Sequence, residues 1–270
     1  MPKVKKLTFA PFFLIFFIIL LSQLSPILKS YDLIFSLSLN SLSQLITISI
    51  LIMLSSFSFV LFAIIALDWK LILGVGGLAA LAPFLFFGLS VGLVFGLGIF
   101  ASLMLIFVTL ENKMKSYLTF SPNTLLGPSI RHLASFLTVA LALVYFLSVS
   151  RIISQSGFEI PDSLIDAALN ITNQTGSNQT SPFAIPQTLQ ETANNLIKQT
   201  VKDQFQNFLK PYLSFIPAIL ALFLFLTLQG FTSLLNLLIY PLLWITFYIL
   251  EKTGFIKFIE EMRPVKKMVA

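Results

Sequence analysis

Long apolar blocks separated by short polar segments set the pattern of this chain. The block 7–28 follows three lysines, and Ser22, Gln23, Ser25 and Pro26 interrupt it only near its end. The block 43–67 is rich in serine and threonine, whose hydroxyls can bond to a carbonyl one turn earlier in the same helix. Because about 20 apolar helical residues cross the hydrocarbon core of a bilayer, each block predicts one membrane span.

The longest block, 71–110, has no charged side chain and seven glycines. As a helix it would measure about 60 Å, roughly twice the thickness of the hydrocarbon core. We therefore expect two spans, 71–87 and 91–110, with a turn near Gly88-Leu89-Ser90. The alternative is a single span over 84–110 that follows a re-entrant segment and uses its glycines as one continuous packing face.

The rest of the chain predicts a further span, an extramembranous segment and a C-terminal pair of spans. The polar stretch 111–132 contains turn dipeptides, which argue against a long helix, and 133–150 is the span that follows it. Segment 151–211 is the only sizeable polar region. We expect 212–250 to form a helical hairpin that turns at Gln229-Gly230, and the tail 251–270 to lie along the bilayer surface.

Segment 151–211 predicts two helices joined by a neutral loop. The first is a short helix over 161–169, and the second is an amphipathic helix over 188–209 that a capping box, Thr188-x-x-Glu191, opens. Apolar residues recur along the second helix at helical period, so one face needs a cover. The residues that we expect to form this partner or interface face are Leu189, Leu196, Ile197, Val201, Phe205 and Phe208.

These elements add up to an all-α protein with about seven transmembrane helices, and six is the alternative. Seven spans place the N-terminus in the cytoplasm and the 152–210 segment outside. The positive-inside rule favours six, because that count gathers more lysine and arginine on the cytoplasmic side. We prefer seven, since a loop of about 60 residues is a weak reporter under that rule.

Composition agrees with a polytopic integral protein of the plasma membrane. Of the 270 residues, 57% are hydrophobic and 10% are charged, which a soluble domain could not accommodate. The many phenylalanines and lysines are typical of AT-rich bacterial genomes. The chain has no cysteine, which excludes disulfides and thiolate ligands. No basic face with interleaved aromatics predicts nucleic-acid binding, so the lipid bilayer is the expected partner.

Candidate chemistry is sparse. No expected span interior contains an ionisable residue, so we expect no catalytic residue, no cofactor and no metal site. Gly88-Leu89-Ser90 is similar to the serine segment of intramembrane serine proteases, but that chemistry needs a histidine on a facing helix. The single histidine, His132, lies at a loop edge, and we expect no enzyme. The amides of Gln229 and Asn236 predict interhelical hydrogen bonds.

The small residues of 71–110 predict helix packing. Gly92-x3-Gly96 and Gly98-x3-Ser102 each place two small residues one turn apart, which lets helix backbones approach closely. We expect Gly88, Gly92, Gly96, Gly98 and Ser102 to mark packing positions rather than to line a pore.

The function expected from these features is that of a non-enzymatic scaffold or assembly component. It would bind a protein partner, or a second copy of the chain, through the 152–210 segment. The alternative is a small uncoupled transporter or channel built on the glycine-rich 71–110 hairpin. Replacing Gly92 and Gly96 with leucine distinguishes the two, because solute flux would change only in a channel.

Overall fold

The computed structural model describes residues 3–29, 39–116, 121–158 and 208–256, together with Thr200 and Gln204. Within these residues every regular element is a helix, and five helical segments are long and apolar enough to cross a membrane. The described elements are α1 (Lys3–Leu7), α2 (Ala10–Lys29), α4 (Leu39–Ala66), α5 (Trp69–Ser116), α6 (Pro122–Ser156), η1 (Lys210–Tyr212), α9 (Ile216–Leu235), η2 (Asn236–Leu238) and α10 (Ile239–Lys252).

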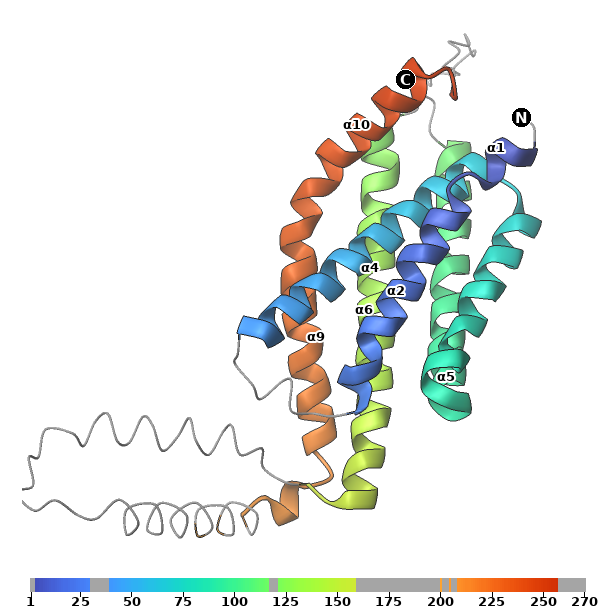
Figure 1. The fold of residues 1–270 in the computed structure, drawn as a ribbon. Coiled ribbons are helices and arrows are strands. Elements are labelled where there is room, and N and C mark those ends of the chain that lie inside the picture. The colour runs from blue at the N-terminus through green and yellow to red at the C-terminus, as the bar shows by residue number, and fades with distance from the viewer. Residues whose placement is uncertain are drawn as a thin grey trace, which may run out of the picture.

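The helices form an up-and-down bundle with both termini of the described chain at one end, which we call the terminal end (Figure 1). Helix α2 leads away from this end and α4 returns to it. Helix α5 leads away and folds back, α6 leads away again, and α9 with α10 returns (Figure 1). The other end, where α6 finishes and α9 begins, is called the distal end below.

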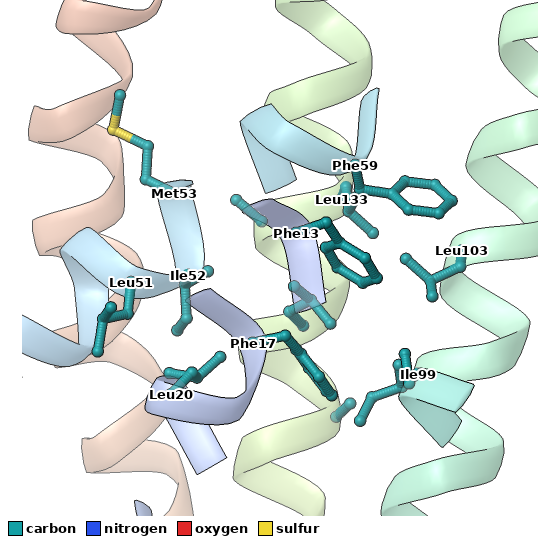
Figure 2. Packing of buried hydrophobic residues seen from close by; sticks show 14 of the residues in the cluster. Phe13, Phe17, Leu20, Leu51, Ile52, Met53, Phe59, Ile99, Leu103 and Leu133 are labelled. Atoms are coloured by element: carbon teal, nitrogen blue, oxygen red, sulfur yellow. The ribbon is translucent and has the colours of Figure 1, made fainter. Parts of the chain in front are cut away.

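Helix α4 forms the centre of the bundle. It packs against α2, α5, α6 and α9, and nearly all of its last two-thirds is buried. A helix that is apolar on all sides needs neighbours all round, which explains its central place. Its Phe59 ring lies edge-on to Phe13 of α2 at a centroid distance of 5.2 Å, and Phe13 stacks on Phe17 at 5.7 Å (Figure 2). Aromatic side chains therefore fill the space between α2 and α4.

Two buried serines of α4 bond to carbonyl groups of their own helix. The hydroxyls of Ser49 and Ser56 donate to the carbonyl oxygens of Leu45 and Ile52, at 2.9 and 2.8 Å. Each hydroxyl is thereby satisfied within its own helix, as expected for these residues.

The turn expected near Gly88 is confirmed. Gly88 has φ 73° and ψ −176°, which interrupts the helical backbone of α5 and divides it into a first arm, 69–87, and a second arm, 89–116. The second arm runs back beside the first (Figure 1). The single span over 84–110, with its re-entrant lead, is therefore wrong.

The polar connection expected over 111–132 is wrong over most of its length. Helix α5 continues to Ser116, and α6 begins at Pro122 rather than at 133. Proline is compatible with a first helical turn, because its φ is already helical and its missing N–H has no partner there. Pro128 lies within α6, so the Gly127-Pro128 dipeptide does not form a turn. The helix also extends beyond the expected end at 150, to Ser156.

The hairpin expected over 212–250 is also wrong. Helix α9 passes through Gln229-Gly230 without a turn, and η2 and α10 follow it directly. The C-cap residue Asn236 keeps helical angles, φ −59° and ψ −22°, and Gly230 is not among the positive-φ glycines of the described chain. A helical glycine costs about 1 kcal/mol relative to alanine, which apolar packing on both sides can offset. The described helices thus run alternately away from the terminal end and back to it, in the order α2, α4, the two arms of α5, α6, and α9 with α10.

Two expected elements fall mainly outside the described residues. The short helix 161–169 lies wholly outside them, and only a few positions of 188–209 are described. Of the tail 251–270, the structure describes the end of α10 and the residues to Ile256. There the N–H groups of Phe255 and Ile256 donate to the carbonyl oxygen of Leu250.

Candidate functional site

Gly92 and Gly96 bring the two arms of α5 into backbone contact. A Cβ atom on Gly92 would lie 2.9 Å from the Cα atom of Phe84, and one on Gly96 would collide with the carbonyl oxygen of Ala80. Gly92 and Phe84 are each four residues from Gly88, and Gly96 and Ala80 are each eight residues from it. An antiparallel hairpin that turns at Gly88 requires this pairing. The arms therefore leave no room for a side chain at these two levels.

The other small residues of α5 have different surroundings. A Cβ on Gly98 would lie 3.4 Å from the Cβ of Ala140, so this glycine faces α6. The Ser102 hydroxyl donates to the carbonyl oxygen of Gly98 at 2.7 Å, within the same helix. No atom lies within 4 Å of a Cβ built on Gly88, which therefore contributes its backbone conformation and no close contact.

The expected partner face on 188–209 is described only at its last residue. Leu189, Leu196, Ile197, Val201 and Phe205 lie outside the described residues. The Phe208 side chain is 67% exposed, and its ring centroid is 6.0 Å from that of Tyr212. An aromatic side chain is therefore open to contact where the chain enters η1.

A second cluster, which sequence reasoning missed, lies between α6 and the α9–α10 helix. The guanidinium carbon of Arg131 lies 5.0 Å from the ring centroid of Tyr240. One turn further along α6, Ser135 accepts a hydrogen bond from Nε2 of Gln229 at 3.2 Å. Asn236 lies one turn before Tyr240 on the same helical run. We call these residues the polar seam: Arg131, Ser135, Gln229, Asn236 and Tyr240.

Several atoms of the polar seam lack hydrogen-bond partners among the described residues. They are Nε of Arg131, Oε1 of Gln229 and Oδ1 of Asn236, and all three are buried. Lys6 pairs with Asp68 and Lys115 pairs with Glu111, so neither of these carboxylates is available to Arg131. A buried polar group without a partner costs about 1–3 kcal/mol. The seam therefore combines a cation in need of an anion with oxygens in need of donors.

Comparison with protein families, curated proteins and solved structures gave no match to this chain. Its function therefore has to be argued from its own residues.

The residues considered for hydrolase chemistry lie apart. Ser90 is exposed beside the turn of α5, at the end of the hairpin remote from the terminal end. His132 is exposed on α6, in the half of that helix nearer to the terminal end. Among the described residues no three His, Cys, Asp or Glu side chains cluster as metal ligands would.

The terminal end ties the two ends of the chain together through its lysines. Nζ of Lys6 lies 4.0 Å from Oδ2 of Asp68, in the connection between α4 and α5. Nζ of Lys5 lies 5.3 Å from the ring centroid of Phe255, which follows α10. Such contacts between exposed groups contribute little energy individually, but both place cations on this end of the bundle.

The sequence did contain a signal for the polar seam. Asn123, Gly127, Arg131 and Ser135 follow one another at intervals of four, which places them along one side of a helix. The expected connection over 111–132 does not place Arg131 on a helix, so it does not predict this shared side.

Proposed function

We propose that the protein is a six-span integral membrane protein that holds a protein partner on the outer side of the plasma membrane through the segment between α6 and α9. The observation that carries the membrane setting is the apolar outer surface of the bundle. Leu85 is 87% exposed on the first arm of α5, and Phe223 and Leu226 are exposed on α9. Lipid chains would cover such a surface, whereas in water it would drive aggregation.

The charges support an orientation with both termini in the cytoplasm. With six spans the terminal end carries Lys3, Lys5, Lys6, Lys70, Lys113, Lys115, Lys252, Lys257, Arg263, Lys266 and Lys267. The distal end carries Lys29, Arg151, Lys198, Lys202 and Lys210. The positive-inside rule assigns the more basic side to the cytoplasm. Both tryptophans support the same boundary, because Trp69 and Trp244 are exposed on helices that reach the terminal end, as in an interfacial aromatic belt.

The partner-binding role rests on the contrast between the packed bundle and the polar segment that joins α6 to α9. Phenylalanines fill the space between α2 and α4, and the arms of α5 touch at Gly92 and Gly96. This packing weighs against a solute path between the arms. The 159–207 segment, in contrast, follows the distal end of α6 and carries the predicted apolar face, and Phe208 beside it is exposed.

Cysteine labelling tests the topology, and the natural absence of cysteine keeps the background low. Single cysteines at Gln155 and Ser177 are expected to react with a membrane-impermeant maleimide in intact cells. Cysteines at Ser116 and Thr253 are expected to react only after permeabilisation. Labelling at Thr253 in intact cells would support seven spans instead. Labelling at Ser116 in intact cells would support the single span over 84–110.

A photo-crosslinking side chain at Phe208 tests partner binding. We expect a discrete protein adduct in cells, because this exposed aromatic adjoins the predicted partner face. The control is the same substitution at Leu226, an exposed residue on the outer surface of α9, which should yield only lipid adducts. The mass of the adduct distinguishes a second copy of this chain from another protein.

Flux measurements test the alternative channel. Liposomes that contain the purified protein should pass no ion or small solute above the protein-free background. If they do pass one, and if leucine at Gly92 and Gly96 changes that flux, the channel replaces the partner-binding proposal.

A further inference from the structure

Arg131 is a cation set deep within a helix. It follows Pro122, the first residue of α6, by nine positions, which corresponds to about 13 Å along the helix axis. In the six-span arrangement this depth lies below the exposed lysines of the terminal end, towards the bilayer interior. An ionisable group within a membrane is costly and usually marks a site with a specific partner. The inference below rests on that arrangement but not on the partner-binding role.

Tyr240 does not satisfy this cation. The guanidinium of Arg131 lies over the face of the tyrosine ring. This contact uses none of the five N–H donors of arginine, which point outward in the plane of the guanidinium. Nε is buried without a hydrogen-bond partner among the described residues. A planar guanidinium whose Nε–H has no partner is suited to two-point contact with a phosphate or carboxylate group.

The amide oxygens of the polar seam further limit the kind of ligand that it can bind. Oε1 of Gln229 and Oδ1 of Asn236 are buried acceptors without donors among the described residues. A small anion without an O–H group, such as sulfate, would satisfy Arg131 and leave these oxygens unpaired. A ligand that carries a phosphate together with hydroxyl groups would satisfy both kinds of group.

Access to the seam is available from the side of the bundle. Tyr240 is 43% exposed, and opposite it stands Gly127, where a Cβ would lie 3.7 Å from Cε1 of the ring. Tyr240 therefore keeps an exposed edge close to Arg131. A group from the surrounding lipid could reach the guanidinium along this edge.

We propose that the polar seam binds the headgroup of an anionic phospholipid with a free polyol, of the phosphatidylglycerol type, from the cytoplasmic leaflet. The phosphate binds the guanidinium of Arg131, and the headgroup hydroxyls donate to the amide oxygens of Asn236 and Gln229. This assignment gives each unpartnered group of the seam a partner of matching chemistry.

Native mass spectrometry of the full-length purified protein tests the proposal. Wild-type protein incubated with phosphatidylglycerol is expected to retain one lipid, and with phosphatidylcholine none. Arg131→Gln should weaken retention by about tenfold or more, since charge-assisted hydrogen bonds are lost, and Arg131→Lys should weaken it less. Lys70→Gln removes an exposed cation near the same end and should retain lipid as wild type does. Equal retention by wild type and Arg131→Gln overturns the proposal.

Two further measurements distinguish lipid binding from a purely structural contact and from binding of a free anion. Tyr240→Leu removes the ring contact and keeps the guanidinium, so it measures how much this contact contributes to the melting temperature. If Tyr240→Leu and Arg131→Gln lower the melting temperature equally, with or without lipid, the contact between Arg131 and Tyr240 serves only to pack the two helices. The proposal then fails. Stabilisation by millimolar inorganic phosphate that matches the effect of lipid also overturns it, in favour of a free anion.

The labelling pattern keeps this failure distinct from failure of the membrane arrangement. Loss of lipid selectivity while Ser177 labels from outside and Thr253 does not would overturn the seam inference alone. A changed labelling pattern would overturn the six-span arrangement on which the inference rests.

Discussion

Leucine at Gly96 is expected to lower the free energy of unfolding by about 3 kcal/mol, the upper end of the range for overpacked cores. The obstacle is the backbone of the facing arm, because even a Cβ would collide with the carbonyl oxygen of Ala80. A flexible side chain could move aside, but a helical carbonyl is fixed by its own hydrogen bond. The two arms of α5 would have to separate, which would also disturb the contact of Gly98 with Ala140.

Leucine at Gly74 is the matched control for this prediction. Gly74 lies on the first arm of the same hairpin, and a Cβ there would meet no atom within 4 Å. Denaturation in mild detergent, followed by tryptophan fluorescence or circular dichroism, should show Gly74→Leu at or above the stability of wild type. Gly92→Ala should fall between the two leucine variants, since its Cβ would lie 2.9 Å from the Cα of Phe84. Equal stability of Gly96→Leu and Gly74→Leu would contradict the close approach of the arms.

The hairpin itself could be predicted from sequence because its length left few alternatives. An apolar run of about 60 Å cannot cross the hydrocarbon core once as a straight helix. What the sequence could not indicate is which helix each glycine faces. Gly88 turns the backbone, and the antiparallel course that follows brings Gly92 opposite Phe84 and Gly96 opposite Ala80. The packing interpretation and the turn interpretation describe different residues of one element.

The errors have a common physical cause. Gly127-Pro128 and Gln229-Gly230 are local turn signals, yet both lie inside helices. Local propensity is weak against tertiary packing, and Gln229 donates to Ser135, which is distant in sequence. Because a turn was expected at each dipeptide, neither side of the polar seam was recognised as a helix that passes the other.

Alanine at Gly88 is expected to destabilise the protein by about 1–3 kcal/mol, through backbone strain alone. The angles of Gly88, φ 73° and ψ −176°, lie in a region that is essentially restricted to glycine. No atom lies within 4 Å of the added Cβ, so steric contact with a neighbour does not contribute. The prediction for Gly96 has a different cause. Gly96 has helical backbone angles, and there the facing backbone leaves no space for a side chain.

The control for this variant is Gly77→Ala, at a helical glycine that also has open space around its Cβ. There alanine should raise stability by up to about 1 kcal/mol, because it restricts the unfolded chain and favours the helix. The test is that the two variants change the free energy of unfolding in opposite directions. In both of them the added methyl group enters open space, so only the backbone conformation differs. Unfolding curves in detergent measure the sign, and labelling of a cysteine at Ser116 shows whether the second arm still returns to the terminal side. A Gly88→Ala variant as stable as Gly77→Ala, with unchanged labelling, would show that the chain turns without the glycine conformation.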